Sequence, residues 1–190
     1  MQTTSMKENS EEIAIELSKT KLVFALLVSI IFVILSSWFI INPQKFVNPI
    51  FRSKEIIFIA GILGVAVFGF FAIMITKKLP DKNKGLIISE SGIFDNSSAS
   101  SVGQIDWNDI IGISKSQVMS TKFLMILVHN PEKYIEKAKS RIAKKNMEAN
   151  LKWYGSPIAI SSNALKIDFN NLEKLLTENF EKYGEQKNVV

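Results

Sequence analysis

The chain has 190 residues, no cysteine and a single histidine, His129. Without cysteine it can form no disulfide, thiolate metal site or iron–sulfur cluster, and it has no cysteine nucleophile. One histidine also excludes a His-rich metal site and the HExxH motif of zinc proteases. No glycine-rich phosphate-binding motif is present outside the apolar stretches. We therefore predict a protein that is not an enzyme and has no catalytic residue, cofactor or metal.

Charge is absent from two stretches of the chain, residues 22–41 and 56–75. At 1.5 Å per residue, each is long enough to cross a hydrocarbon core of about 30 Å. A cleaved signal peptide is the alternative for the first stretch, but this stretch is longer than a signal core and no small-residue cleavage site follows it. A buried hairpin in a soluble core is the alternative for both. Two uncharged stretches of this length favour two transmembrane helices.

The connection between the two stretches, residues 42–55, contains Pro43 and Pro49, which stop a helix from continuing through it. The two helices are then antiparallel neighbours, and both chain termini lie on the same side of the membrane. Basic residues near the helix ends number seven on the terminal side and three in the connection. The positive-inside rule therefore predicts a protein of the cell membrane with two spans, a cytoplasmic segment 1–21 and both termini in the cytoplasm.

Small residues occur at matching depths in the two predicted spans. If Leu22 is level with Ile75, Ser36 lies level with Gly61 and Ser29 lies one residue from Gly69. Small side chains let helices approach closely, so Ser29, Ser36, Gly61 and Gly69 are predicted to form the packing surface of the hairpin. A pore or transporter is the functional alternative, but neither span contains the ionisable residues that transport sites usually need.

The rest of the chain has the pattern of a soluble α+β domain. Residues 76–84 form a basic linker with Pro80, and residues 85–184 contain short β-type runs separated by turn residues. Such spacing predicts an antiparallel sheet or small barrel. A final amphipathic helix begins near a capping box of Asn170 and Glu173 and ends near Gly184, leaving residues 185–190 as a tail. Its apolar face is predicted to pack across the sheet.

A basic segment, residues 131–152, interrupts the β pattern. Asn130 and Pro131 suit the start of a helix, and the segment contains seven basic residues. Close to a membrane these charges would attract anionic lipids. The alternative is a solvated helical insertion. Aromatic residues are too few nearby for a nucleic-acid platform, so no nucleic-acid partner is predicted. The candidate lipid- or partner-binding residues are Lys133, Lys137, Arg141, Lys144 and Lys145.

The segment before the first span also alternates. Ile13, Ile15 and Leu17 are separated by polar or small residues, a pattern typical of a strand. Because it lies on the same side of the membrane as the domain, we predict that it adds a strand to the domain's sheet. The alternative is a frayed start to the first helix.

Several other polar residues are of types that can serve in catalysis or ligand binding. Asp106 and Asp109 flank Trp107, but Asp109 in a turn is expected to bind nearby backbone groups. The serines between residues 97 and 101 have no neighbouring base that would activate a nucleophile. His129, at the edge of a loop, is expected to be structural or solvated. Trp107 is predicted to anchor a corner of the core.

Several short motifs resemble those of a family of small bacterial membrane proteins to which no function is assigned. The motifs are Gly85-Leu86-Ile87-Ile88, Glu90-Ser91-Gly92-Ile93, Asp95-Asn96-Ser97-Ser98, Ile105-Asp106-Trp107-Asn108-Asp109-Ile110, Asn130-Pro131-Glu132-Lys133-Tyr134 and Tyr154-Gly155-Ser156-Pro157-Ile158. The resemblance covers most of the chain after Ile15. It implies a two-helix membrane hairpin joined to a pleckstrin-homology-like (PH-like) domain, an open antiparallel barrel capped by a C-terminal helix. The family has no established active site whose residues could be carried over.

The sequence thus predicts an integral membrane protein that presents a PH-like binding domain at the cytoplasmic face. Its expected ligand is a protein segment or an anionic lipid, since such scaffolds bind through open strand edges or basic faces. The expected partners are membrane lipids and another membrane or cytoplasmic protein. The alternative is a structural subunit that joins a membrane complex through its helical hairpin.

Overall fold

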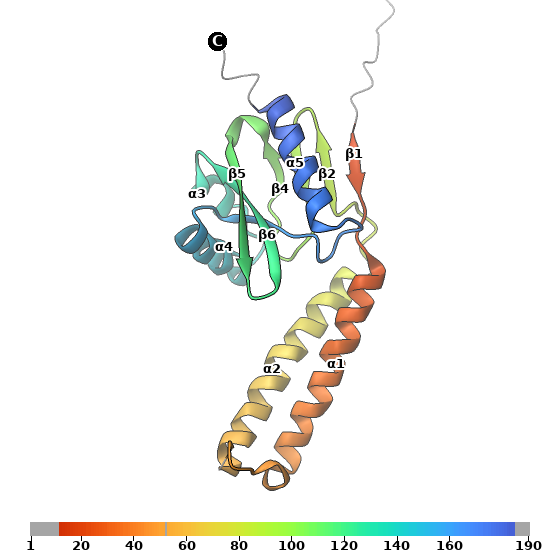
Figure 1. The fold of residues 1–190 in the computed structure, drawn as a ribbon, viewed down its shortest axis with the longest axis vertical. Coiled ribbons are helices and arrows are strands. Elements are labelled where there is room, and N and C mark those ends of the chain that lie inside the picture. The colour runs from red at the N-terminus through yellow and green to blue at the C-terminus, as the bar shows by residue number, and fades with distance from the viewer. Residues whose placement is uncertain (1–11, 52, 185–190) are drawn as a thin grey trace, which may run out of the picture. The chain divides into compact units, whose positions relative to one another are not determined.

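The computed structural model describes residues 12–51 and 53–184, and the chain forms two compact units (Figure 1). The helical unit is Ser18–Lys82. The sheet unit combines the residues up to Leu17 with those from Asn83 onward. The predicted tail, residues 185–190, lies outside the described residues, as do residues 1–11 of the N-terminal segment.

The helical unit consists of two long helices joined by a short 3-10 turn. They are α1, Lys19–Ile41, and α2, Lys54–Lys78, with η1, Pro43–Phe46, between them. The side chains of Ser18 and Ser53 cap the two helices by accepting hydrogen bonds from backbone N–H groups of their first turns. With 23 and 25 residues, the helices are roughly 35 and 38 Å long. Both are therefore long and apolar enough to cross a bilayer.

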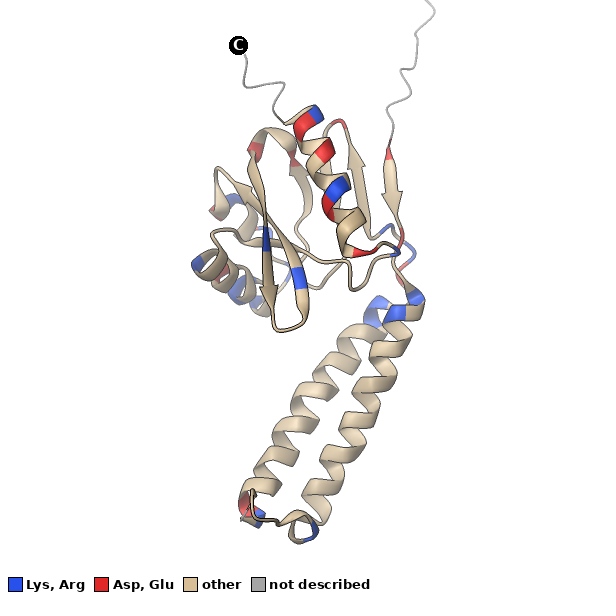
Figure 2. Ribbon diagram, viewed as in Figure 1, with Lys and Arg blue, Asp and Glu red and all other residues tan. Residues whose placement is uncertain are grey.

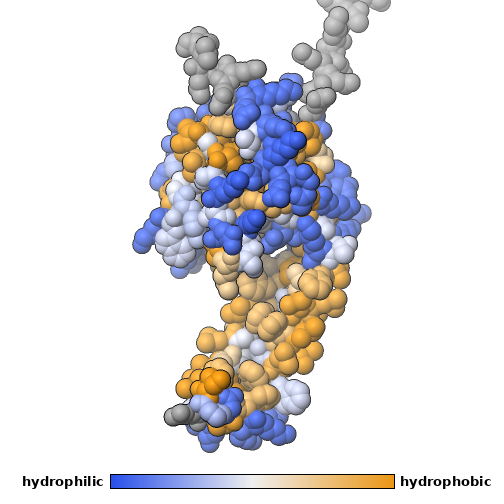
Figure 3. Space-filling model, in the orientation of Figure 1, coloured by the Kyte–Doolittle hydropathy of each residue, from blue (hydrophilic) through white to orange (hydrophobic). Residues whose placement is uncertain are grey.

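Most side chains of this unit have no protein cover. In each helix only 11% of the most hydrophobic stretch is buried, and the surface of the helices is largely apolar (Figure 3). Phe24, Ile41 and Leu63 are each more than half exposed. The core helix of a soluble protein would be covered on at least one face. An apolar surface on both helices is instead what a hydrocarbon environment stabilises.

Small residues let the two helices meet around Ser36. A Cβ atom placed on Gly61 would lie 2.8 Å from the Ser36 carbonyl oxygen, and one on Gly64 would lie 2.2 Å from the Ser36 Oγ. Neither position can hold a larger side chain unless the backbones separate. The predicted packing of Ser36 against Gly61 is therefore present in the structure, and Gly64 contributes to it as well.

The other predicted pair is not in contact in this way. A Cβ on Gly69 would meet no atom within 4 Å. Ser29 is buried, but its hydroxyl donates a hydrogen bond to Ala25 of its own helix. The reason is the register: Phe32 stacks on Phe68 with ring centroids 4.4 Å apart, about three residues from the predicted alignment. These rings fill the space between the helices, so Gly69 is not part of the close approach.

The sheet unit contains two antiparallel sheets, whereas the turn spacing predicted an antiparallel sheet or a small barrel. The first has the strand order β1-β2-β3-β4 and the second has the order β5-β6-β7. The bounds in the first sheet are β1 Ile13–Ile15, β2 Leu86–Ser89, β3 Gly92–Asp95 and β4 Gly103–Asp106. The 3-10 turn η2, Trp107–Asp109, leads into the second sheet, whose bounds are β5 Ile110–Val118, β6 Thr121–Val128 and β7 Ile158–Ile160.

The structure has a strand where the alternation before the first span predicts one. β1 pairs antiparallel with β2, with Ile13 opposite Ile88 and Ile15 opposite Leu86. In the sequence, the whole helical unit therefore lies between two strands that are neighbours in one sheet. We call the end of the sheet unit where the chain leaves at Leu17 and returns at Asn83 the connection end.

Polar and apolar contacts join the segments that meet at the connection end. Leu17 forms an isolated bridge with Leu165. The Glu16 carboxylate accepts hydrogen bonds from Lys84, at 3.1 Å, and from Lys166, at 2.6 Å. Hydrogen bonds from Lys166, then from Lys84, lower the pKa of Glu16 from its ordinary 4.5 to about 2. The carboxylate thus links β1 to two later segments of the chain.

The C-terminal helix α5, Phe169–Tyr183, packs its apolar face into the core. Leu172 and Leu176 are fully buried. Its cap is Asp168, whose side chain accepts a hydrogen bond from the Asn171 N–H, so the helix begins two residues before the predicted cap at Asn170. Trp107 is the predicted core anchor: its Nε1 donates to the Ser89 carbonyl at 2.8 Å, and its ring stacks near those of Phe180 and Tyr183.

Two helices, not one, connect β6 to β7. They are α3, Pro131–Ile135, and α4, Arg141–Tyr154. The Ser140 side chain accepts a hydrogen bond from the Ala143 N–H and so starts a second helix. This restart changes the phase of the helix, so that Ile135 of α3 is buried and Ile142 of α4 is not. Ile142 is 61% exposed, whereas Ala143 and Met147 are buried.

Candidate ligand-binding surface

Two of the five predicted binding residues have structural partners. The Lys133 ammonium pairs with Asp109 and lies 3.7 Å from Asp106. The Lys137 Nζ donates to the Gln104 carbonyl at 3.2 Å and lies 4.7 Å from the centre of the Tyr134 ring. Both lysines therefore link α3 and the residues that follow it to β4 and η2. They are not candidates for ligand binding.

A buried tyrosine completes this contact. Tyr134 is fully buried, and its hydroxyl donates to Asp109 Oδ2 at 2.6 Å. The hydrogen bond from Lys133, followed by that from Tyr134, lowers the pKa of Asp109. Burial, followed by the hydrogen bond to Asp109, raises the pKa of Tyr134. Asp109 thus binds side chains 24 and 25 residues later, and not the nearby backbone groups expected from the sequence.

The other three predicted residues are exposed on α4. Arg141, Lys144 and Lys145 extend from the outer side of this helix, opposite its buried residues, and basic residues are visible along it in Figure 2. Lys152 follows on the same side about two turns later. Within the described part of the chain, Arg141, Lys144 and Lys145 form no ion pair. These four residues, Arg141, Lys144, Lys145 and Lys152, are called the cationic face below.

Local signals fix the position of α4. Gly155 ends the helix with φ +77°, a left-handed conformation that favours glycine, and its N–H donates to the Leu151 carbonyl. Next to it, the buried Ser156 hydroxyl donates to the Ile126 carbonyl and accepts from the Ile158 N–H. These bonds attach the end of α4 to β6 and β7. The cationic face is therefore held on a rigid element and not on a loop.

A groove of about 450 Å³ lies beside α4. Its floor is the outer face of the second sheet, where Met125 stands opposite Ala159 and Phe123 opposite Ser116. One wall is α4, through Asn146, Ala149 and Trp153, and the other is the loop after β3, through Ser98 and Ser100. A mostly apolar groove of this volume with a few polar groups has the character of a small-molecule or segment-binding site.

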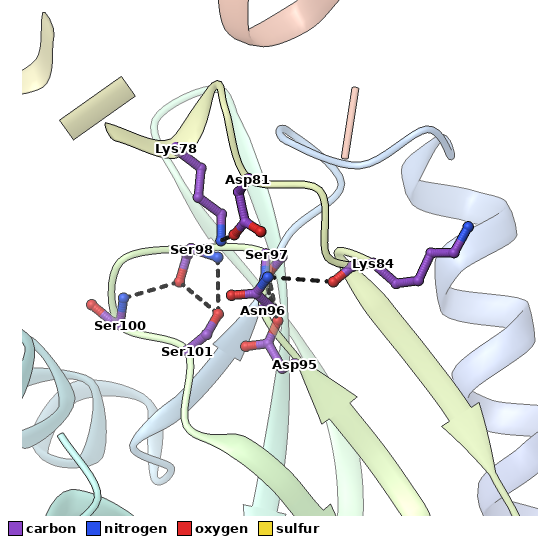
Figure 4. Close-up of polar contacts among 9 residues, drawn as sticks. All are labelled: Lys78, Asp81, Lys84, Asp95, Asn96, Ser97, Ser98, Ser100 and Ser101. Carbon is purple, nitrogen blue, oxygen red and sulfur yellow. Dashed lines mark hydrogen bonds and ion pairs between the residues drawn. The ribbon is translucent and has the colours of Figure 1, made fainter. Parts of the chain in front are cut away.

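The loop after β3 forms its own hydrogen-bond network (Figure 4). The Asp95 side chain accepts from the Ser97 N–H at 2.9 Å and from the Ser97 hydroxyl at 2.6 Å. The Ser101 Oγ accepts from the Ser98 N–H at 2.8 Å, and the Ser98 Oγ accepts from the Ser100 N–H. Serine hydroxyls therefore hold the loop in shape. Asp95, the one charged residue of the groove lining, is 1% exposed.

The loop also connects the groove to the connection end. The Asn96 N–H donates to the Gly85 carbonyl at 2.9 Å, and the Asn96 side chain donates to the Lys84 carbonyl at 3.4 Å. Asn146 of α4 reaches the same loop, donating to the Ser100 Oγ at 3.0 Å. The groove therefore opens beside the residues where the chain returns from the helical unit.

The serine cluster and His129 form hydrogen bonds within the sheet unit. The serine cluster is bonded to itself, to Asp95 and to Asn146. The Asp95 carboxylate at the Ser97 hydroxyl also accepts from the Ser97 N–H and is buried, so it stabilises the loop. The backbone N–H of His129 donates to the Asp109 carbonyl. Among the described residues, no group of three or more His, Cys, Asp or Glu side chains could hold a metal ion.

The exposed residue Met119 lies in a turn that the sequence pattern does not indicate. The β5–β6 hairpin turns through Met119 and Ser120, since Val118 pairs with Thr121. Met119 is 92% exposed and has φ +53°, a conformation that turns usually give to glycine or asparagine. A sequence that reads Val-Met-Ser-Thr contains no such turn residue, so the pattern alone did not predict a tip here.

Comparisons with known proteins add no relative. No protein family, curated protein or solved structure matches the chain.

Proposed function

We propose that this protein is a membrane-anchored binding module whose PH-like domain binds anionic lipid headgroups at the cytoplasmic face. The single observation that carries the proposal is the cationic face of α4, whose Arg141, Lys144 and Lys145 are exposed and unpaired within the described part of the chain. A rigid helix that holds several free cations attracts an anionic surface, with each charge contributing about 1 kcal/mol.

The membrane anchor rests on the two apolar helices and on the strand pairing. Because β1 and β2 belong to one sheet, the chain must cross the membrane an even number of times between them. Two spans satisfy this condition and leave both ends of the hairpin on one side. The excess of basic residues next to the sheet unit supports the cytoplasmic side.

The PH-like assignment rests on the order of the elements. Four strands in one antiparallel sheet, three in a second and then one amphipathic helix are the order expected for this scaffold. The motifs that suggest the resemblance fall on β2, β3, the β4–β5 junction, α3 and the start of β7. In this proposal the helical hairpin is an insertion in the loop between the first two strands.

The position of the domain limits what it can meet. Only three residues separate β1 from α1, and seven separate α2 from β2. At no more than about 3.6 Å per residue, these links keep the connection end within reach of the headgroups. A lipid headgroup is therefore the ligand that the domain encounters at the highest concentration.

The test uses the full chain in nanodiscs and a single cysteine in place of Glu148, which is exposed on α4. A fluorophore at this position reports contact through quenching by headgroup-labelled lipids. Including phosphatidylglycerol in a phosphatidylcholine disc is expected to increase quenching, and high salt should reverse the increase. The triple variant Arg141→Glu, Lys144→Glu, Lys145→Glu is expected to remove the dependence on anionic lipid.

A matched control reverses charges elsewhere. Lys174 and Lys182 lie on α5, and their replacement by glutamate should leave the response to phosphatidylglycerol unchanged. Equal quenching in neutral and anionic discs would exclude headgroup binding by α4. A membrane partner retained by the triple variant would then support the alternative of an accessory subunit assembled through the hairpin.

A further inference from the structure

We infer that the tip of the β5–β6 hairpin, together with the end of α4, inserts into the bilayer interface. The inserting surface consists of Val118, Met119 and Trp153, which we call the apolar tip. The inference goes beyond headgroup attraction, because it assigns a second and apolar contact to named residues. It rests on the proposed function only in placing the sheet unit at a membrane surface.

The first observation is the conformation of Met119. A side chain with a Cβ atom is disfavoured at positive φ, and turns of this kind select glycine or asparagine. Here the position holds a large apolar residue that is 92% exposed and contributes nothing to the core. The Gln117 side chain supports the turn by donating to the Met119 carbonyl at 2.7 Å. An exposed apolar residue held in an unfavourable conformation indicates a role outside the folded domain.

The second observation is that the tip is not a single residue. Val118 and Trp153 line the same groove, so the hairpin end and the last turn of α4 both border it. Their side chains are 41% and 69% exposed. Trp153 combines a large apolar ring with a polar N–H, a combination that favours the membrane–water interface. Two elements that border the groove thus carry exposed apolar residues.

The third observation is the place of the tip in the sheet unit. β3 ends at the connection end, with Asp95 opposite Leu86 and Gly103. β4 runs away from that end, and β5 runs back, so the β5–β6 turn points toward it. The groove agrees with this direction, because Val118 lines it together with Ser98 and Ser100, from the loop that contacts Gly85. The tip and both attachment points therefore lie at the same end of the unit.

Charge next to the tip selects the partner. Lys122 follows Met119 by three residues, with its Nζ 5.6 Å from the centre of the Phe169 ring, and Lys152 immediately precedes Trp153; both lysines are exposed. Apolar side chains flanked by lysines match a bilayer, in which acyl chains lie beneath anionic headgroups. An apolar protein surface would satisfy Met119 but not the neighbouring cations. The partner to which these observations point is the bilayer on which the domain is anchored.

Because the chain contains no cysteine, one introduced thiol can be labelled cleanly. Met119→Cys is labelled with an environment-sensitive fluorophore in the full chain in nanodiscs. Ser120→Cys is a second reporter that keeps Met119 in place. The control is Ser91→Cys in the β2–β3 turn, which is exposed and lies at the opposite end of the sheet unit. Discs contain phosphatidylcholine, alone or with phosphatidylglycerol, and lipids that carry a quencher on the acyl chain.

Insertion predicts emission at shorter wavelength and acyl-chain quenching at position 119 or 120, but not at position 91. A label at both tip positions that emits as in water, in neutral and in anionic discs, would overturn the inference. Insertion that persists in neutral discs while the α4 reporter shows no effect of phosphatidylglycerol would support the apolar tip and refute headgroup binding. A response of the α4 reporter to phosphatidylglycerol, without insertion at positions 119 and 120, would refute insertion of the apolar tip and leave headgroup binding supported. An equal emission shift at positions 119, 120 and 91 would show that the signal is not specific to the tip, and would also refute the inference.

Discussion

Replacing Met119 by asparagine is expected to stabilise the sheet unit, although it removes a large side chain. A residue with a Cβ atom loses about 1–2 kcal/mol in the left-handed conformation, and Met119 has φ +53° with almost no contact to offset this cost. Asparagine tolerates the conformation because its short side chain can bond the local backbone. The expected gain is about 1 kcal/mol. Glycine should give less, because it loses roughly 0.5–1 kcal/mol of backbone entropy on folding.

The assay is thermal unfolding of the full chain in nanodiscs, followed by the emission of Trp107. This residue is 2% exposed, and tyrosine at positions 38 and 153 removes the other tryptophan signals. For a domain of this size, 1 kcal/mol corresponds to an increase in Tm of about 4–8 °C. Ser120→Asn is the matched control, since it changes the adjacent turn residue, which does not have a positive φ. A lower or unchanged Tm for Met119→Asn would refute the argument that the turn is strained.

The remaining predictions concern other parts of the fold. Gly64→Val is expected to lower the thermal stability of the hairpin because a Cβ there collides with Ser36, whereas Gly69→Ala, which meets open space, should leave it unchanged. Gly155→Ala should destabilise the sheet unit by about 1–2 kcal/mol, measured as a fall in Tm, because its φ is +77°. The contact of Glu16 with Lys84 and Lys166 should be intact above pH 4.5 and weaken as the pH falls toward about 2, because the pKa of Glu16 is lowered in the fold. Faster hydrogen exchange of the Gly85 amide, which donates to Ile15, would report this loss, and Glu16→Gln should abolish its pH dependence.

The features predicted well from the sequence are those that depend on local pattern. Two uncharged runs of twenty residues need no tertiary context to indicate long apolar helices. Short β-type runs between turn residues located the strands of both sheets, and the alternation of Ile13 and Ile15 located β1. The apolar face of α5 follows from helical spacing alone.

The features that sequence reasoning missed depend on contacts between distant residues. Asp109 binds Lys133 and Tyr134, from which it is separated by the strands β5 and β6, and nothing near Asp109 in the sequence indicates these partners. The groove exists because α4 packs beside the outer face of the second sheet, an arrangement that no single segment encodes. The restart of the helix at Ser140 changed which residues are buried. In the hairpin, Ser36 meets both Gly61 and Gly64, and Phe32 stacks on Phe68 about three residues from the predicted alignment.

The cationic candidates show how packing changes a prediction based on charge. Composition treats all five basic residues alike, yet Lys133 and Lys137 form internal contacts, whereas the other three form no ion pair with any residue that the structure describes. Only the position of Asp109 and Gln104 separates the two groups. Selecting residues for mutagenesis from charge alone would therefore confuse loss of fold with loss of binding.

The insertion of the helices between β1 and β2 has a consequence for biosynthesis. Glu16 and Lys84 are 68 residues apart, so at about 5–20 residues per second the ribosome needs roughly 3–14 seconds between them. During this interval β1 is synthesised but has no partner strand, and Glu12 and Glu16 beside its apolar residues protect it from pairing with other chains. In the arrangement proposed above, the sheet can close only after both helices have entered the bilayer, since a single crossing would leave β1 and β2 in different compartments. The proposal therefore makes completion of the sheet depend on integration of both helices.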